Sequence, residues 1–364
     1  MPDKEKYLEL NGQKILLADL QHFELEEMVL SAFEKDTLSF IQSWLRGEGY
    51  FTVPTSGSTG KPKDIEIPRS AMEHSAHLTG NALKLATGDR ALACINTAYI
   101  GGKMMLARAL ILGMDLTVVT PSSNPFATIE PGRYFDFIAL VPLQLETLLA
   151  EGGGVNILNQ AKAIIVGGAA VSEQLKQKMQ VIDAPIYATY GMTETVSHIA
   201  LKKLNGPDGD QHFKVFDEMI IGQDERDCLT IQSKLTGGNT IITNDRVRII
   251  SSHEFEWLGR IDNVVNTGGV KVQVEQLEFS ISSILTGLGR NENFMVGAVD
   301  DQRLGQKLIL LLEGPESPED ALLDQLKKQL AFHAPREIKW IKEFSRTATG
   351  KINRGLTMKK LRGK

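Results

Sequence analysis

Residues 55–63 read Thr-Ser-Gly-Ser-Thr-Gly-Lys-Pro-Lys and carry the densest chemical signal in the chain. Small residues let backbone N–H groups approach phosphate oxygens, while hydroxyl and ammonium groups add hydrogen bonds and positive charge. A Walker A loop is excluded by spacing, because Thr55 and Pro62 stand where that motif needs a glycine and a hydroxyl. The segment directly follows the apolar run 50–53, which favours a phosphate-binding loop over a flexible surface loop.

The whole chain has the composition of an ordinary globular protein, with 364 residues, 42% hydrophobic and 23% charged. Forty Lys and Arg against 45 Asp and Glu give a net charge of −5, which argues against a nucleic-acid-binding protein. Two cysteines, Cys94 and Cys228, are too few for a disulfide framework. No apolar run of about 18 residues could span a bilayer, and the charged N-terminus lacks a secretion-signal core. We therefore expect a cytoplasmic protein without membrane insertion.

On either side of the glycine-rich loop, apolar runs alternate with helical patterns. Ser70 and Glu73 have the spacing of a capping box, which predicts the start of a helix. Buried strands that alternate with helices are typical of an α/β sheet with largely parallel pairing. Strands are expected at 92–95, 116–119, 137–141 and 163–166, and helices at 24–46, 70–84, 103–112 and 172–180.

After residue 217 the pattern changes to short, alternating strands. The last hundred or so residues could form a core of their own. We place the boundary at Gly259, which predicts two domains, residues 1–258 and 259–364. Strands are expected at 228–232, 240–243, 247–250, 294–299 and 308–312, and helices at 274–285 and 318–332.

Five further motifs follow the glycine-rich loop in a fixed order. They are Val166-Gly167-Gly168-Ala169-Ala170, Tyr190-Gly191-Met192-Thr193-Glu194-Thr195, Thr243-Asn244-Asp245, Gly259-Arg260-Ile261-Asp262-Asn263 and Arg346-Thr347-Ala348-Thr349-Gly350-Lys351-Ile352. In this order they resemble the adenylate-forming superfamily of acyl-CoA and aryl-CoA synthetases, peptide-synthetase adenylation domains and luciferases. The resemblance implies an α/β fold. It also implies a large N-terminal domain of layered sheets and helices, followed by a small, mobile α+β C-terminal domain.

The chemistry implied by the resemblance converts a carboxylate and ATP into an acyl-adenylate and pyrophosphate, followed by transfer to a thiol. ATP, Mg²⁺ and coenzyme A would take part, and cations and positioning would carry most of the catalysis. Thr193, Glu194 and Lys351 would be catalytic, with Glu194 as the Mg²⁺ ligand. The nucleotide-binding residues would be Thr55, Ser56, Ser58, Thr59, Lys61, Gly168, Ala169, Tyr190, Gly191, Asp245 and Arg260.

In the same family, Asp262 would be the hinge about which residues 259–364 rotate between adenylation and thioester formation. Residues 1–258 would then bind ATP and the acyl substrate. Gly268 and Gly269 would let the pantetheine of coenzyme A pass close to the backbone, and they equally fit a tight strand turn. The phosphate loop begins earlier than in relatives, so we expect a truncated N-terminal subdomain.

The acyl pocket of the family lies between segments that correspond to 96–105 and 195–199. Lys103 interrupts an apolar, glycine-bearing run, and a second carboxylate on the substrate would gain from that cation. Arg108 lies five residues further, off the helical face of Lys103, and is interpreted as a solvated surface residue. The candidate pocket residues are Tyr99, Gly102, Lys103, Ser197 and His198.

These two segments are similar to the o-succinylbenzoate–CoA ligases of menaquinone biosynthesis, whose aromatic substrate carries two carboxylates. The expected partners are thus a small carboxylic acid, ATP and coenzyme A. Three alternatives remain open: another aryl- or acyl-CoA ligase, a stand-alone adenylation enzyme that loads a carrier protein, and a nucleotide-binding protein without catalysis. No protein partner is indicated.

Overall fold

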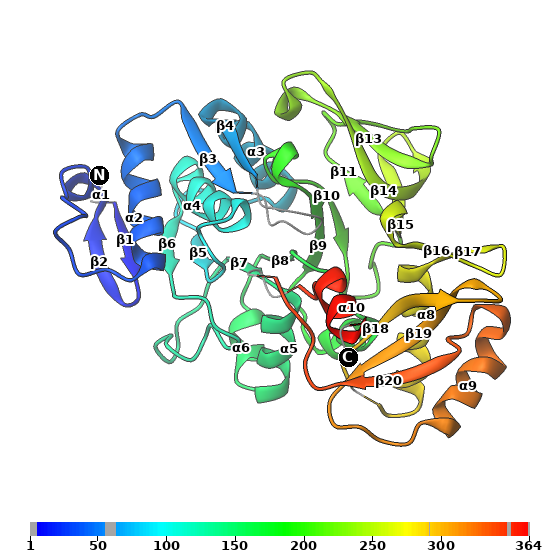
Figure 1. Cartoon of the computed structure of the whole chain (residues 1–364). Coiled ribbons are helices and arrows are strands. Elements are labelled where there is room, and N and C mark those ends of the chain that lie inside the picture. The colour runs from blue at the N-terminus through cyan, green and yellow to red at the C-terminus, as the bar shows by residue number, and fades with distance from the viewer. Residues whose placement is uncertain (1–5, 55–62, 291, 348–350, 363–364) are drawn as a thin grey trace. The chain divides into compact units, whose positions relative to one another are not determined.

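The computed structural model in Figure 1 describes residues 6–54, 63–290, 292–347 and 351–362. The chain divides into two compact units, which are described separately. Unit 1 comprises Met1–Val171, Leu175–Ile220 and Gln232–Ile241; unit 2 comprises Ser172–Gln174, Ile221–Ile231 and Ile242–Lys364. Both units combine sheets with helices, which confirms the predicted α/β class. None of the described helices is both long and apolar enough to cross a membrane.

The large sheet of unit 1 has the strand order β11-β10-β9-β8-β7-β5-β6-β1-β2. Neighbouring strands from β6 through β9 pair in parallel, as the alternation of strands and helices predicted. The four strands expected in this region are confirmed to within two residues at each end. The strands are β1 (Tyr7–Leu10), β2 (Gln13–Leu16), β5 (Arg90–Ala93), β6 (Asp115–Val118), β7 (Phe137–Leu140), β8 (Ala163–Val166), β9 (Ile186–Gly191), β10 (His198–Lys203) and β11 (Phe213–Val215).

Helices cover this sheet through apolar side chains. On one face, Leu145 and Leu175 pack with the strand residues Ile138 and Ile164 in a single buried cluster. Two further helices, α3 and α4, approach each other so closely that a Cβ on Gly80 would lie 3.0 Å from the Leu112 side chain. The helices are α1 (Leu17–Leu20), α2 (Ala32–Leu45), α3 (Arg69–Leu83), α4 (Ile100–Leu112), α5 (Pro142–Glu151), α6 (Gly154–Leu158) and α7 (Glu173–Lys178), with 3-10 turns η1 (Met179–Val181), η2 (Thr193–Thr195) and η3 (Lys234–Thr236).

Several helix starts differ from the sequence prediction; α4, for example, begins at Ile100 and not at the predicted residue 103. The helix expected from residue 24 begins only at Ala32, because Ser31 caps it in a capping box with Glu34. The capping box expected at Ser70 is wrong. Helix α3 already begins at Arg69, directly after Pro68, and Ser70 lies inside its first turn.

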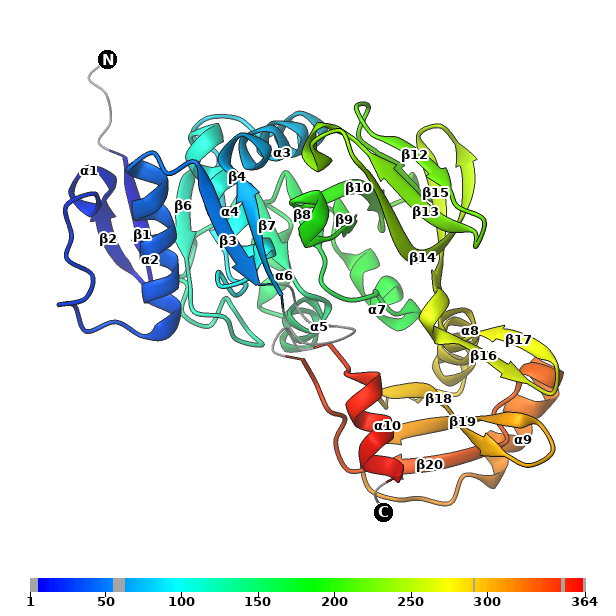
Figure 2. The same ribbon diagram turned by 45° about the horizontal axis from the view of Figure 1, so that its top comes forward.

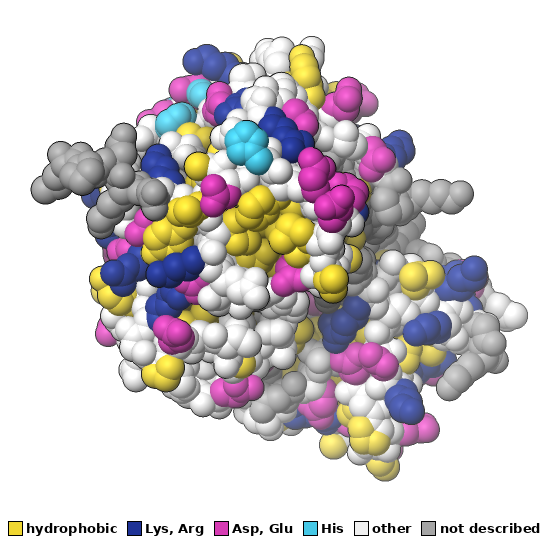
Figure 3. Space-filling view, turned by 90° about the vertical axis from the view of Figure 1, so that its left-hand side faces the viewer, with side chains coloured by type: hydrophobic (Ala, Val, Ile, Leu, Met, Phe, Trp, Pro, Cys, Tyr) yellow, Lys and Arg dark blue, Asp and Glu magenta, His cyan; other side chains and the backbone are white. Residues whose placement is uncertain are grey.

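The face of the molecule shown in Figure 3 carries acidic and basic side chains interspersed with apolar ones.

Unit 1 also contains a separate antiparallel hairpin of β3 (Tyr50–Pro54) and β4 (Asp64–Pro68). Pro54 pairs with Asp64 at its end. The glycine-rich segment 55–62 connects these two strands and lies outside the described residues.

Unit 2 contains four neighbouring strands, β12 (Ile220–Gln223), β13 (Cys228–Gln232), β14 (Thr240–Ser251) and β15 (Glu254–Arg260), of which β14 and β15 pair antiparallel. Strand β14 is a single strand, so the prediction of two short strands at 240–243 and 247–250 is wrong. It stays extended across residues 244–246 because Asp245 and Arg246 pair with Arg260 and Gly259 of β15.

The remainder of unit 2 is a five-stranded sheet with the order β17-β16-β19-β18, in which β20 pairs with β19 in parallel. Helices α8 and α9 lie on one face of this sheet and α10 lies on the other (Figure 2). Alternate residues of β19 enter two cores: Leu308 and Leu310 pack with residues of α8 and α9, and Ile309 packs with residues of α10. The elements are β16 (Val264–Thr267), β17 (Val270–Gln273), α8 (Val274–Gly287), β18 (Phe294–Asp301), β19 (Gly305–Glu313), α9 (Asp320–Leu330), β20 (Glu337–Ile341) and α10 (Arg354–Arg362), with η4 (Ile261–Asn263) and η5 (Ala331–His333).

The compact units do not divide at the predicted residue 259. Unit 2 also includes β14 and β15, because the backbone N–H of Arg260 donates to Glu275 of α8 at 3.2 Å and Gln273 donates to the Arg260 carbonyl at 2.8 Å. The domains 1–258 and 259–364 stay a prediction about which parts of the chain move.

Candidate active site

Two of the expected nucleotide motifs follow neighbouring parallel strands of unit 1. Gly168 and Ala169 come directly after β8, and Tyr190 and Gly191 end β9. The carboxyl ends of parallel strands meet at one edge of a sheet, where α/β proteins bind ligands. A Cβ on Gly167 would lie 2.4 Å from the Thr189 hydroxyl, so a larger residue there would require the Thr189 side chain to move.

Tyr190 is mostly enclosed by protein. Its ring lies 5.9 Å from the Phe213 ring in a tilted arrangement, and the residue is 9% exposed. The stacking of adenine on Tyr190 stays a prediction. Gly191 cannot carry a side chain, because a Cβ would lie 2.3 Å from the Ser197 carbonyl oxygen.

The turn η2 presents Thr193 and Glu194 between β9 and β10. Thr193 is 8% exposed, whereas the Glu194 side chain is exposed. The Thr195 hydroxyl accepts the Met192 N–H at 3.0 Å and lies 2.8 Å from the Ser197 carbonyl. Val196 then has φ +66°, which costs energy for a β-branched residue and persists only when the surroundings fix it.

Glu194 fits a single magnesium ligand. The described residues hold no group of three or more His, Cys, Asp and Glu side chains that could enclose a metal. Mg²⁺ in phosphate sites usually takes one or two carboxylates and completes its shell with phosphate oxygens and water. One exposed carboxylate in a rigid turn meets that need.

Arg108 is not on the surface, contrary to the sequence interpretation. It is 1% exposed; its Nη2 donates to Ser197 Oγ at 2.6 Å and its Nε to Thr79 Oγ1 at 3.2 Å. Burial lowers the pKa of Arg108 to about 9. Among the described residues no carboxylate forms an ion pair with it, so this cation has no compensating charge within the described part of the chain.

His198 completes this buried cluster. Its Nε2 lies 3.0 Å from Thr79 Oγ1, and its Nδ1 lies 3.4 Å from Arg108 Nη2. Burial, reinforced by the Arg108 charge, lowers the pKa of His198 well below its ordinary value. The imidazole is therefore neutral near pH 7, with Nδ1 accepting from the guanidinium and Nε2 donating to Thr79.

The Lys103 side chain leaves helix α4 in a different direction from that of Arg108. Its Nζ lies 5.4 Å from the Phe40 ring centroid, and it lines a cavity of about 260 Å³ with Asp36 and Tyr50. Burial lowers the pKa of Lys103, and Asp36 opposes the shift. The structure therefore joins Ser197 and His198 to Arg108. The pocket role of Lys103 stays a prediction.

The other two pocket candidates shape the start of α4. Tyr99 is its N-cap residue. A Cβ on Gly102 would lie 2.3 Å from the Asn96 carbonyl oxygen, so this glycine lets the helix approach the preceding loop. The phosphate-loop candidates Thr55, Ser56, Ser58, Thr59 and Lys61 lie outside the described residues.

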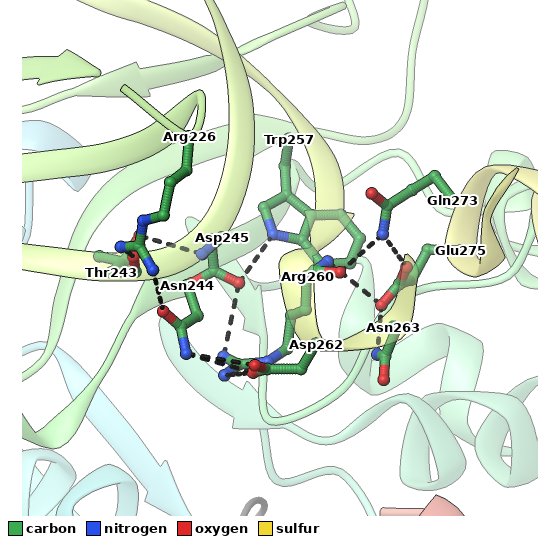
Figure 4. Close-up of polar contacts among 10 residues, drawn as sticks. All are labelled: Arg226, Thr243, Asn244, Asp245, Trp257, Arg260, Asp262, Asn263, Gln273 and Glu275. Atoms are coloured by element: carbon green, nitrogen blue, oxygen red, sulfur yellow. Dashed lines mark hydrogen bonds and ion pairs between the residues drawn. The ribbon is translucent and has the colours of Figure 1, made fainter. Parts of the chain in front are cut away.

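In unit 2, the expected ribose residues lie side by side on paired strands (Figure 4). Asp245 of β14 is 8% exposed and pairs with Arg260 of β15 in register. Arg260 Nη1 lies 3.7 Å from Asp245 Oδ1, and Trp257 Nε1 donates to the same oxygen at 3.2 Å. The structure thus brings Asp245 and Arg260 together, as the motifs implied.

The expected hinge residue Asp262 forms polar contacts with residues of both β14 and β15. Arg260 Nη2 lies 2.7 Å from its Oδ2, and the Asn244 amide donates to it at 3.3 Å. Asn244 in turn accepts from Arg226 at 3.3 Å. Asn244 of β14 therefore links Asp262 to Arg226, which lies in the turn between β12 and β13 (Figure 4).

Lys351 follows residues 348–350, which are outside the described ones. Its backbone N–H donates to the Thr347 hydroxyl at 3.2 Å, and its carbonyl accepts the Thr347 N–H at 2.7 Å. Burial and the nearby Arg260 lower the pKa of Lys351, while Asp245 raises it. Three predicted site residues therefore share one electrostatic neighbourhood in unit 2.

Gly268 and Gly269 form an exposed tight turn between β16 and β17, with φ of +60° and +84°. The turn reading is confirmed, and the pantetheine role stays a prediction. Sequence reasoning missed Trp257, Gln273 and Glu275. An aromatic residue in a strand pattern indicates packing, and nothing in the spacing shows which carboxylate it contacts.

Comparisons with known proteins agree with the motifs. The family model described as AMP-binding enzyme matches residues 9–216. The chain is 38% identical to an acyl-CoA synthetase (AMP-forming)/AMP-acid ligase II-like protein from Dyadobacter fermentans, covering 91% of this chain and 95% of that one at a TM-score of 0.60.

Two further relatives are more distant. A 2-succinylbenzoate–CoA ligase from Bacillus cereus is 22% identical, over 94% of this chain and 78% of its own length. The o-succinylbenzoate coenzyme A synthetase MenE from Bacillus subtilis, solved with ATP and magnesium, is 22% identical. It matches at a TM-score of 0.68 over 84% of this chain and 69% of that one, which is a likeness of fold.

Proposed function

The chain belongs to the AMP-binding enzyme family of adenylate-forming ligases, and we propose that it converts o-succinylbenzoate to o-succinylbenzoyl-CoA in menaquinone biosynthesis. The reaction would consume ATP, release pyrophosphate and pass through an acyl-adenylate. The 2-succinylbenzoate–CoA ligases among the relatives support this substrate.

The observation that carries the choice of acid is the buried guanidinium of Arg108. Enclosing a cation without a compensating carboxylate costs several kcal/mol by desolvation, so a chain with no use for the charge gains from an apolar residue there. Arg108 contacts Ser197 in the segment that the motifs place beside the acyl group. An acid with a second carboxylate supplies the missing negative charge, and a fatty acid or benzoate does not.

The remaining site residues have roles that their chemistry supports. Asp245 and Arg260 would hold the ribose, and Thr193 would donate to the α-phosphate from its rigid turn. Lys351 would place its ammonium between the attacking carboxylate and the α-phosphate, where negative charge develops. Mg²⁺, when bound, neutralises phosphate charge, and Glu194 would hold it.

The thiol step needs Lys351 out of the way. Rotation of residues 259–364 about Asp262 would withdraw the lysine and let coenzyme A enter past Gly268 and Gly269. The bond between Asp262 and Asn244 crosses the predicted boundary at residue 259, and such a rotation would have to exchange it.

The test measures pyrophosphate release from Mg-ATP with single acids, with and without coenzyme A. The informative pair is o-succinylbenzoate and 4-oxo-4-phenylbutanoate, which lacks only the ring carboxylate. We expect release with the first acid, a thioester only when coenzyme A is present, and much weaker release with the second. Equal pyrophosphate release with both acids would contradict the proposed substrate and leave the adenylate-forming mechanism supported. Adenylate without any thioester would instead indicate an enzyme that loads a carrier protein.

A further inference from the structure

Trp257 has a polar contact that its strand position alone does not require. Its indole Nε1–H donates to Asp245 Oδ1 at 3.2 Å, from β15 to the neighbouring β14 (Figure 4). A half-buried indole N–H needs some acceptor, and water or a backbone carbonyl would serve. The acceptor here is the carboxylate that the motifs assign to the ribose.

A β-bulge brings these two side chains to one face. Asp245 pairs with Arg260 and Arg246 with Gly259, but Val247 pairs with Trp257, so Leu258 is an extra residue on β15. In regular pairing Trp257 would lie opposite Arg248 and point to the other face, because side chains alternate along a strand. The bulge thus moves the indole to the face of Asp245.

The bulge is also fixed from outside. Gly259 has φ +128°, and a Cβ there would lie 2.5 Å from the Glu275 carboxylate and 2.6 Å from the Gln273 amide. Bulges are common beside active sites, where they re-aim a side chain. The Trp257 ring is thus held in place by the bulge, by Gly259, and by the Gln273 and Glu275 side chains beside that glycine.

We propose that Trp257 is a positioning residue for nucleotide recognition: its indole N–H fixes the plane of the Asp245 carboxylate so that the carboxylate meets the ribose hydroxyls. This inference rests on the proposed function, which supplies ATP as the ligand. Fixing Oδ1 by Trp257 and Arg260 also fixes the place of Oδ2, and hydrogen bonds to a ribose depend on that geometry.

The first experiment compares the affinities for ATP and 2′-deoxy-ATP by isothermal titration, in wild type, Trp257→Phe and Trp340→Phe. The control suits the question, because Trp340 donates its indole N–H to the Ser317 carbonyl at 2.9 Å on another strand of unit 2. We expect wild type to prefer ATP, and Trp257→Phe to lose about three- to tenfold of that preference. Trp340→Phe should keep it. An unchanged preference in Trp257→Phe, or an equal loss in both variants, would overturn the inference.

A double-mutant cycle separates positioning from a general weakening of the fold. Asp245→Asn should abolish the preference for ATP, and adding Trp257→Phe to it should change the preference no further. Independent, multiplying effects would mean that Trp257 does not act through Asp245.

A spectroscopic readout works without nucleotide. The chain has three tryptophans, each giving one indole N–H signal in a ¹H–¹⁵N correlation spectrum, and Trp257→Phe assigns its own. Asp245→Asn should shift the Trp257 signal and leave those of Trp44 and Trp340 in place; an unmoved Trp257 signal would overturn the contact. Wild type that binds neither nucleotide would instead contradict the proposed function, whatever the indole signal does.

Discussion

Lys103 and Arg108 lie five residues apart on α4, and the helix sends their side chains in directions about 140° apart. The angle was readable from the sequence, but not which direction leads into the protein. The structure shows Lys103 beside Phe40 and Arg108 in contact with Ser197 and Thr79. The interpretation from helical spacing relative to Lys103 therefore assigned the buried cation to the surface, which is wrong.

Replacing Arg108 with methionine should damage activity far more than stability. We expect the KM for o-succinylbenzoate to rise about tenfold or more, because Ser197 and the acid lose a charge-assisted interaction. The free energy of unfolding should change by no more than about 1 kcal/mol, since the lost hydrogen bonds are offset by removal of a desolvated cation. Steady-state kinetics and urea unfolding measure the two quantities.

Lys103→Met is the matched control, on the same helix and with the same loss of charge. It should leave the KM for o-succinylbenzoate within about twofold, because Lys103 faces Phe40 and Asp36. A larger rise in KM for Lys103→Met than for Arg108→Met would mean that Lys103, and not Arg108, binds the second carboxylate of the substrate.

At the scale of elements, periodicity located most helices and strands, and local capping chemistry decided where they begin. Ser31 and Ser70 both precede an acidic residue by three positions. Only Ser31 has the extended backbone of an N-cap, with φ −65° and ψ 161°, and only there does the hydroxyl accept from the N3 backbone. Pro68 already ends β4 before Ser70, so the second box has no place to form.

Ser31→Ala should lower the free energy of unfolding by about 1 kcal/mol, because α2 loses the hydroxyl that accepts the Glu34 N–H and donates to the Glu34 carboxylate. Ser70→Ala should leave it unchanged, since Ser70 is exposed within the first turn of α3. Thermal denaturation of both variants compares them directly. A greater loss for Ser70→Ala would mean that Ser70 is the N-cap and that α3 begins two residues later than described.

At the scale of the molecule, an ion pair joins distant segments of unit 2 close in sequence to Lys351, the proposed catalytic lysine. Glu278 of α8 pairs with Arg354, which begins α10 three residues after Lys351. Arg354 also donates to the Val296 carbonyl at 3.1 Å, and Glu278 accepts the Val296 N–H at 2.6 Å. Burial raises the pKa of Glu278, and Arg354 opposes that shift.

Glu278→Gln should therefore slow the first half-reaction selectively. We expect acid- and ATP-dependent adenylate formation to fall about tenfold, because Lys351 loses its fixed position, while thioester formation from supplied acyl-adenylate stays near wild type. Single-turnover measurements of the two steps provide the test. Equal slowing of both steps would indicate a loss of fold in unit 2 and not a role in positioning Lys351.

The sequence alone determined the α/β class, the parallel pairing of the strands and the order of the nucleotide motifs. These depend on periodicities and short spacings that are local along the chain. It also assigned Asp245 and Arg260 to one ribose site; the paired strands bring the two side chains together, and the ribose role stays a prediction.

The tertiary structure decided which side chains meet across distance. Arg108 and Ser197 are 89 positions apart in the sequence and meet in the buried cluster. Trp257 and Asp245, 12 positions apart, meet through a bulge, and Glu278 and Arg354, 76 positions apart, form an ion pair. Such contacts depend on helix rotation, strand register and packing. One added residue in a strand, or a rotation of a helix about its axis, would give the side chains different neighbours. Local patterns therefore revealed the chemistry available, and only the folded chain shows which groups act on one another.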